Sequence, residues 1–204
     1  MRHMATRTRL TPEQRREQLL AFGVAWIADK PFGELSLDLL AEHTGVSRGL
    51  LYHYFGGKQE YQYAVLQRLS DDLFEATAPV DHPDMVHRMR VSLENFVAWV
   101  RNHRTAYDEF VAVARGGGSP EVAEIYARGR NALTDRIFES ATTEELAVYG
   151  IADSAATRLF ARGWATMVED VVTAWLDEPG DLTEDQMIDA FTLSLGGILG
   201  LVAS

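Results

Sequence analysis

Residues 35–60 contain the pattern that most constrains how this chain of 204 residues can fold. Ser36 is a suitable N-cap for a first short helix, and Gly45 interrupts the helical spacing where a C-cap or tight turn is needed. Ser47 can then cap a second short helix. The apolar positions that recur at helical spacing are Leu37, Leu40, Ala41, Leu51 and Phe55. Two short helices around a glycine turn predict a helix-turn-helix, in which the second helix lies in the major groove of DNA.

The outward positions of the second helix suit nucleic-acid binding. The planar fork of Arg48 matches O6 and N7 of guanine, and the exposed apolar Leu50 suits a thymine methyl group. His53 can donate a hydrogen bond to a base or a phosphate, and Gly49 lets the helix approach the groove closely. A helical hairpin that binds no DNA is the alternative reading of this pattern.

The sequence GVSRGLLYHYFGGKQE closely resembles the signature of the tetracycline-repressor (TetR) family of bacterial transcription regulators. The matching elements, in order, are Ala41, Gly45-Val46-Ser47, Leu51-Tyr52-His53-Tyr54-Phe55 and Lys58. The resemblance implies an all-α fold, with an N-terminal three-helix DNA-binding head joined by a fourth helix to a helical-bundle body. We expect the N-terminal arm and helix-turn-helix domain over residues 1–57, and the ligand-binding and dimerisation domain over residues 58–204.

The resemblance also implies roles for individual residues. Lys58 lies where the family holds a phosphate at the start of the fourth helix, and Tyr52 and Tyr54 resemble the family's aromatic contacts to phosphate and sugar. The complete set of predicted DNA-binding residues is Ser36, Ser47, Arg48, Gly49, Leu50, Tyr52, His53, Tyr54 and Lys58. Tyr54 could instead be half in the core, and His53 could be a solvated surface group. Arg7 and Arg9 could form an arm over the DNA backbone or a free basic tail.

The net charge of −11 is unusual for a DNA-binding protein, but the charges are unevenly distributed. Residues 1–58 carry a formal charge of +2, whereas the remaining residues carry −13. A mildly basic head on an acidic body suits a protein that presents one end to phosphates. The absence of cysteine excludes disulfides and thiolate metal sites, and it fits the reducing cytoplasm.

The rest of the chain is predicted to be helical throughout. Thr11-Pro12-Glu13-Gln14 reads as a capping box with proline at the first helical position. Most relatives have glycine near position 31, where this chain has Pro31, so we expect the first helix to end near Asp29. The further helices are predicted over residues 58–78, from residues 81–83 onward, around 107–114 up to a break at 116–118, from 119–120 onward, and over 154–176 and 184–202. No apolar run reaches the length needed to span a bilayer, and no signal peptide is recognisable.

In the family, the helices of the body enclose a ligand pocket, and this chain has suitable aromatic and polar residues there. The pocket candidates are Phe96, Trp99, His103, Tyr107, Phe110, Tyr126, Arg130, Trp164 and Met167. The alternative is that these helically spaced side chains only pack the core. Arg130, if buried, needs an anion, which could be a ligand or could be Glu169 or Asp170.

One recognition helix covers too few base pairs for high specificity, so we expect a homodimer that binds two half-sites. The interface candidates on the last two long helices are Phe160, Val168, Val171, Val172, Trp175, Phe191, Leu195, Ile198 and Leu199. Gly196, Gly197 and Gly200 would permit close approach. The alternative is that these stripes pack only within one chain.

The sequence therefore predicts a cytoplasmic, dimeric transcriptional regulator of double-stranded DNA with a palindromic operator. The resemblance implies a repressor that a small-molecule effector releases by binding one state better than the other. A DNA-binding structural or division-control protein without a ligand is the alternative. We expect no enzymatic activity, because the chain has no nucleophile motif and no paired histidine spacing. No catalytic residue, metal, cofactor or membrane association is predicted.

Overall fold

The computed structural model describes residues 10–117 and 119–202, and every regular element in these ranges is a helix. The elements in chain order are α1 (Pro12–Ile27), a 3-10 helix η1 (Phe32–Glu34), α2 (Leu37–Thr44), α3 (Arg48–Phe55), α4 (Lys58–Ala76), α5 (Met85–Asn102), α6 (Arg104–Arg115), α7 (Pro120–Glu139), α8 (Thr143–Val148), α9 (Ala155–Asp177) and α10 (Glu184–Val202). The expected all-α class is confirmed. Arg7, Arg9, Gly118 and residues 203–204 lie outside the described residues.

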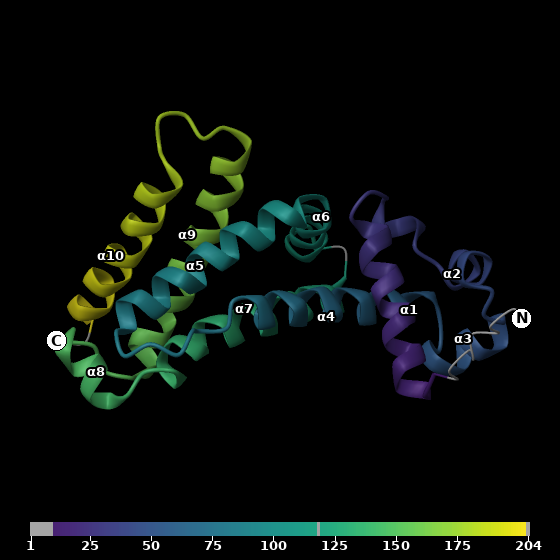
Figure 1. Ribbon diagram of the computed structural model, residues 1–204, viewed down its shortest axis with the longest axis horizontal. Coiled ribbons are helices and arrows are strands. Elements are labelled where there is room, and N and C mark those ends of the chain that lie inside the picture. The colour runs from purple at the N-terminus through teal and green to yellow at the C-terminus, as the bar shows by residue number, and fades with distance from the viewer. Residues whose placement is uncertain (1–9, 118, 203–204) are drawn as a thin grey trace, which may run out of the picture.

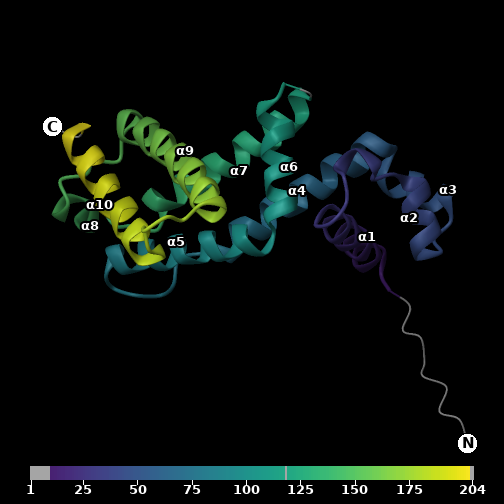
Figure 2. The ribbon, with the colours of Figure 1, turned by 90° about the horizontal axis from the view of Figure 1, so that it is seen from above.

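The molecule is elongated, with α1–α3 at one end and α8–α10 at the other (Figure 1). We call α1–α3 the head and α5–α10 the body. α4 starts in the head and continues into the body, where it packs along α7. Seen from above, α9 and α10 lie side by side at the end far from the head (Figure 2).

The local signals in residues 35–60 produce the predicted helix-turn-helix. The Ser36 hydroxyl accepts a hydrogen bond from the Leu39 amide at 3.3 Å, and the Ser47 hydroxyl accepts one from the Leu50 amide at 3.4 Å. Gly45 ends α2 with a φ of 69°, a left-handed conformation that glycine adopts without steric cost. Because the caps and the turn are encoded locally, this part of the fold follows directly from the sequence.

The start of α1 is the predicted capping box of Thr11 and Gln14. α1 ends at Ile27, two residues before the expected position near Asp29. Pro31 then leads into η1, which the sequence analysis did not predict. A 3-10 turn of three residues has no apolar periodicity to detect.

The predicted boundaries of the other helices shift by a few residues. α4 ends at Ala76 instead of residue 78, and α5 begins at Met85 behind an Asp84 cap. α7 begins at Pro120 behind its Ser119 cap, α9 begins at Ala155 behind its Ser154 cap, and α10 has the expected bounds. The short helix α8 was missed, although Thr142 and Glu145 form a capping box before it. Leu146 is its single buried residue, so it has no repeating apolar face.

The expectation that no segment could span a membrane needs correction for α10. By length and composition alone, this helix is apolar enough to cross a bilayer. Met187, Ile188 and Phe191 are each at most 4% exposed, because they pack into the core of the body. A core helix of a globular protein meets the same two criteria, so the finding is weak evidence for a membrane span.

α4 packs tightly on α1. Tyr61 is completely buried, and its hydroxyl donates to the Leu19 carbonyl at 2.9 Å. Burial raises the pKa of Tyr61, so the hydroxyl stays protonated and able to donate. Arg68 of α4 forms an ion pair with Glu17 of α1. Gly23 of α1 faces this part of α4, and a Cβ there would lie 2.8 Å from the Tyr61 hydroxyl and would clash with Val65.

We therefore expect Gly23→Ala to destabilise the protein by about 1–3 kcal/mol, because the added methyl group overpacks the α1–α4 contact. The free energy of unfolding in urea measures this. The matched control is Gly49→Ala in α3, where an added Cβ meets nothing within 4 Å. That change should stabilise by about 0.5–1 kcal/mol through helix propensity. Equal effects of the two substitutions would contradict the close packing at Gly23.

Candidate functional site

α3 is exposed along the side that faces away from the head's core. Tyr52 is 53% exposed and Leu50 is 40% exposed, which is high for side chains of their size and polarity. The exposed members of the predicted DNA-binding set are Ser47, Arg48, Gly49, Leu50, Tyr52, His53 and Lys58. Ser36 and Tyr54 are half-buried, which fits the alternative that Tyr54 also contributes to the core.

Arg48 is held in place by an acidic residue that sequence reasoning overlooked. Its Nε lies 2.8 Å from Oδ1 of Asp38 in α2, and both side chains are more than half exposed. Such surface pairs contribute about 0–1 kcal/mol, so a guanine edge or a phosphate can compete for the guanidinium. Asp38 restricts the orientation of the Arg48 side chain, but the ion pair is exposed to solvent and is not buried in a core.

Lys58 opens α4 beside the same surface. Its Nζ donates to the Gly33 carbonyl at 2.7 Å, which fixes the ammonium group between η1 and α4. The N-cap residue Gly57 supplies no capping side chain. The first amides of α4 and the Lys58 ammonium add positive potential at this corner, as a phosphate contact requires, whereas the Glu60 carboxylate in the first turn of α4 opposes it.

A cavity of about 110 Å³ lies in the body between the end of α4 and helices α5, α7 and α9. Of the nine pocket candidates, Phe96, Arg130 and Trp164 line it. The lining residues that sequence reasoning missed are Thr77, Pro79, Met85, Arg88, Met89, Ser92, Leu93, Leu133, Thr134, Arg136, Ile137, Ser140, Ala165, Val168 and Glu169. Several of these occupy helical positions that look like ordinary core from spacing alone, so no local signal singles them out.

The other pocket candidates do not line this cavity. Trp99, Tyr107, Phe110 and Tyr126 surround a void of about 20 Å³, large enough for little more than one water molecule. They belong to the hydrophobic core of the body, as the alternative reading of the aromatic stripes stated.

The prediction of pocket residues is also corrected at His103 and Met167. His103 stacks on Trp99 with ring centroids 4.4 Å apart and lines neither space. Met167 is 38% exposed on the outer side of α9.

Glu169 is a buried carboxylate at the edge of both spaces. It accepts hydrogen bonds from the hydroxyls of Tyr107 at 3.0 Å and Tyr126 at 2.6 Å. Nη2 of Arg115 donates to it at 3.1 Å, and Nη1 of Arg130 lies 3.5 Å away. Glu169 is thus one of the two anions expected for Arg130, whereas the other, Asp170, pairs with Arg115.

The two tyrosines stay protonated beside this carboxylate. Burial, and then the charge of Glu169, raise the pKa of Tyr126 to about 12. The same two causes raise the pKa of Tyr107 well above its ordinary value. Both hydroxyls are therefore donors at neutral pH and fix the position of the carboxylate. Neither Glu169 nor Arg115 was among the predicted site residues.

The interface candidates divide into two groups. Val168, Val172, Phe191, Leu195 and Leu199 are at most 5% exposed within one subunit. They pack α9 and α10 into the core of the body. The prediction that these five residues contact a partner subunit directly is therefore corrected, and the alternative of packing within one chain applies to them. Trp175 and Ile198 are half-buried. Phe160 and Val171 remain on the surface, 49% and 36% exposed.

Phe160 and Val171 belong to a set of exposed small and apolar residues on the last two long helices. We name as the outer stripe the exposed small and apolar residues Ala156, Phe160, Gly163, Met167, Val171 and Ala174 of α9 together with Leu193 and Gly197 of α10. On each helix its members recur three or four positions apart, so they share a face of that helix. Phe160 and Val171 were predicted as interface candidates and Gly197 as permitting close approach. The other members were not predicted for the interface, because a largely apolar helix does not reveal which side is inward.

The comparisons with known proteins agree with this architecture. The family model described as "Bacterial regulatory proteins, tetR family" matches residues 19–60, which include the helix-turn-helix. The chain is similar to the HTH-type transcriptional activator FasR of Mycolicibacterium smegmatis, at 25% identity over 89% of this chain and 81% of the relative.

Two solved structures have a similar fold over most of this chain. A tetR-family regulator from Streptomyces coelicolor superposes with a TM-score of 0.70, at 24% identity over 95% of this chain and 83% of the other. A TetR-like regulator from Rhodococcus sp. RHA1 gives a TM-score of 0.58, at 27% identity over 94% of this chain and 100% of the other. The helix-turn-helix of this chain matches the tetR family of bacterial regulatory proteins, and together with the fold and these relatives it supports a DNA-binding transcriptional regulator of the TetR family.

Proposed function

We propose that this regulator binds a palindromic operator in double-stranded DNA as a homodimer, and that a small molecule in the body cavity releases it. The observation that carries the proposal is the separation of two surfaces along one chain. α3 lies at the head end of the molecule (Figure 1). The cavity lies in the body, beyond the last residue of α4. We accordingly propose that residues 1–57 bind DNA and that residues 58–204 bind the ligand and form the dimer.

On DNA, Arg48 reads guanine in the major groove and Leu50 contacts a thymine methyl group. Tyr52, Tyr54 and Lys58 contact phosphate and sugar, which position the head without selecting a sequence. Ser36, Ser47 and His53 add polar contacts at the edges, and Gly49 leaves room for the groove. The salt bridge to Asp38 supports this role of Arg48, since it orients the guanidinium before DNA arrives.

The dimer forms through the outer stripe. A twofold interface uses the same surface on both subunits, and α9 with α10 offers a two-helix surface for a four-helix contact. Gly163 and Gly197 lie within the stripe and allow the helices to approach closely. The exposed apolar side of α10, which gives that helix its membrane-like composition, would then be covered by the partner subunit rather than by lipid.

The ligand acts through α4. Thr77 and Pro79, which follow α4, form part of the cavity wall, so a molecule in the cavity touches the loop in which α4 ends. A ligand in the cavity would favour one state of the dimer. The spacing of the two heads on the operator would favour another state. A cavity of this kind favours the ligand-responsive regulator over the ligand-free structural protein. We place the protein in the cytoplasm, where the bacterial chromosome lies.

The direction of regulation has two candidates. Release from an operator that overlaps a promoter gives a repressor, the behaviour that the family resemblance implies. The relative from Mycolicibacterium smegmatis is named as an activator, so activation from the same operator is the second candidate.

Binding to a palindromic operator is the step that both candidates share, and it is tested by selecting bound fragments from random genomic DNA. A palindrome with half-sites spaced for a dimer supports the proposal, and sequence-independent binding alone would overturn it.

We expect Arg48→Ala and Tyr52→Ala to weaken DNA binding in different ways. Loss of Arg48 should reduce discrimination by about 1–3 kcal/mol at one base pair of each half-site. Loss of Tyr52 should weaken binding to all sequences by a similar factor, because it contacts the backbone. Fluorescence anisotropy with a set of single-base operator variants measures both effects. Arg128→Ala, which removes an exposed cation of α7, should leave them unchanged. A uniform loss for both head variants would remove Arg48 from base reading.

We expect Phe160→Glu to convert the dimer into a monomer, because two added carboxylates would meet across the twofold axis of the outer stripe. Sedimentation velocity measures the change in mass, and circular dichroism checks that the subunit stays folded. Val86→Glu is the matched control, since Val86 is 38% exposed on α5 outside the stripe. A Phe160→Glu protein that stays dimeric would place the interface elsewhere.

A further inference from the structure

The cavity in the body is mostly apolar, and its size limits what it can hold. Met85, Met89, Leu93 and Phe96 line one side from α5, and the ring of Trp164 lines another from α9. The Trp164 Nε1 already donates to Phe191 and Ser194, each at 3.1 Å, so this residue offers only its apolar surface. A cavity of about 150 Å³ in a protein core can hold a benzene molecule. The 110 Å³ present here suits an apolar group of about six carbons or fewer.

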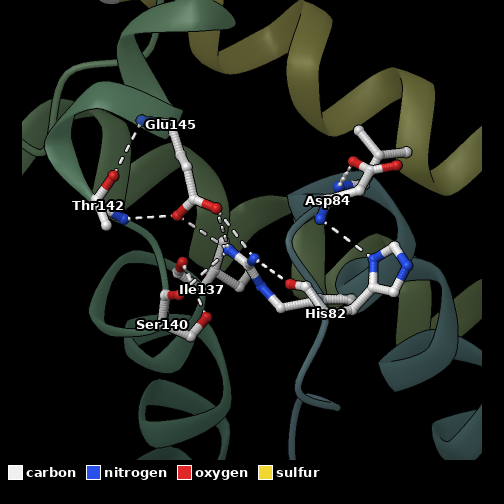
Figure 3. A network of polar contacts seen from close by, with 8 residues as sticks. His82, Asp84, Ile137, Ser140, Thr142 and Glu145 are labelled. Atoms are coloured by element: carbon white, nitrogen blue, oxygen red, sulfur yellow. Dashed lines mark hydrogen bonds and ion pairs between the residues drawn. The ribbon is translucent and has the colours of Figure 1, made fainter.

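The described residues that line the cavity include more cations than anions. Arg88, Arg130 and Arg136 line it, whereas Glu169 is the one carboxylate among the described lining residues. Both Nη atoms of Arg88 donate to Glu145 at 3.0 to 3.1 Å, while its Nε is buried without a hydrogen-bond partner among the described residues. Figure 3 shows Glu145 and the carbonyls of His82 and Ser140 gathered around this guanidinium. The charge of Arg88 is therefore already neutralised by Glu145.

Arg136 is tied to the wall in a different way. Its Nη1 donates to the Phe74 carbonyl at 2.6 Å, and the guanidinium lies over the Phe74 ring. Burial lowers the pKa of Arg136 from its usual value, which indicates a cation that is desolvated more than it is compensated. Its contacts are to a neutral carbonyl and a ring, so its charge adds to the positive potential around the cavity.

Arg130 is the lining cation with the most donors to spare, because no hydrogen bond within the described part of the chain ties its Nη atoms as those of Arg88 are tied to Glu145. Its side chain is one-quarter exposed, its Nε is buried without a hydrogen-bond partner, and its Nη1 is 3.5 Å from Glu169. Glu169 already accepts from Tyr107, Tyr126 and Arg115, so its negative charge is shared among several groups. A donor that is buried and unpaired is costly, and an added acceptor would relieve that cost. The guanidinium fork matches a planar carboxylate, to which it can donate two parallel hydrogen bonds.

We propose that the cavity binds a small monocarboxylate whose apolar body has about six carbons, with the carboxylate on Arg130 and the body between α5, α7 and α9. This inference rests on the proposed function as a ligand-responsive regulator, because it names the chemical class of the effector. Arg130 selects the anionic head, whereas the apolar walls contact the chain behind it. Glu169 is a positioning residue that keeps Arg130 at the edge of the cavity.

Hexanoate and hexanamide are a matched pair of probes, since they differ in charge but hardly in size. Isothermal titration calorimetry with the full-length protein should show hexanoate binding at least about tenfold more tightly than hexanamide. Arg130→Gln should remove this preference and leave hexanamide binding unchanged. Arg128→Gln, on the exposed side of the same helix and paired with Glu124, should keep the preference. Because the preference is first measured in the wild-type protein, the test does not depend on the Arg130 variant being folded.

Equal affinity for the two probes, tighter binding of hexylamine, or no binding of either at millimolar concentration would overturn the assignment of a carboxylate. A second arm separates this outcome from a failure of the proposed function. Hexanoate is added to the protein on its selected operator, and dissociation is followed by anisotropy. If hexanoate binds with the expected preference but leaves the DNA complex intact, the ligand class stands and ligand-induced release is wrong.

Discussion

The arrangement of this protein depends on how α4 is buried at both of its ends. Its first half packs on α1 through Tyr61 and Val65, and its second half packs on α7 through Leu69, Ser70 and Leu73. At each contact the facing helix carries a glycine, Gly23 on α1 and Gly129 on α7, and a Cβ there would clash with α4. Close backbone approach on two sides makes α4 a rigid connection, because interiors at this packing density deform little. The position of the recognition helix is therefore coupled to the packing of the body.

A single hydrogen bond supplements this connection. The amide of Phe32 in η1 donates to Oε1 of Glu109 in α6 at 2.7 Å. The head is thus joined to the body along α4 and at α6, which also contacts α1. Two attachments restrict the head more than one, since rotation about the axis of α4 would break the contact at Glu109. A change in the body that moves α6 relative to α4 would tilt the head rather than let it swing freely.

The sequence predicted the head well and the body only in outline, for physical reasons. Ser36, Gly45 and Ser47 act on residues within one helical turn, so their effect can be read from short spacing. Whether Trp99 or Phe96 lines a cavity depends on which neighbours four other helices place nearby, and spacing along one helix does not contain that information. The same holds for α9, where Val168 is buried and Val171 is exposed although both are valines on one apolar helix. The ion pair of Arg130 with Glu169 was one of the alternatives that the sequence left open for a buried arginine, but the contribution of Arg115 from α6 was not foreseen.

The uneven charge along the chain affects how the protein meets DNA before any specific contact forms. The first 58 residues are net positive and the remainder carries −13, while the fold places the recognition helix at one end of a long molecule (Figure 2). The negative charge of the protein is therefore concentrated away from the recognition helix. Within the screening distance of about 8 Å at physiological ionic strength, the DNA field repels the acidic body much more strongly than the head. The field therefore exerts a torque that turns the head toward the double helix, so that fewer collisions with DNA are wasted in the wrong orientation.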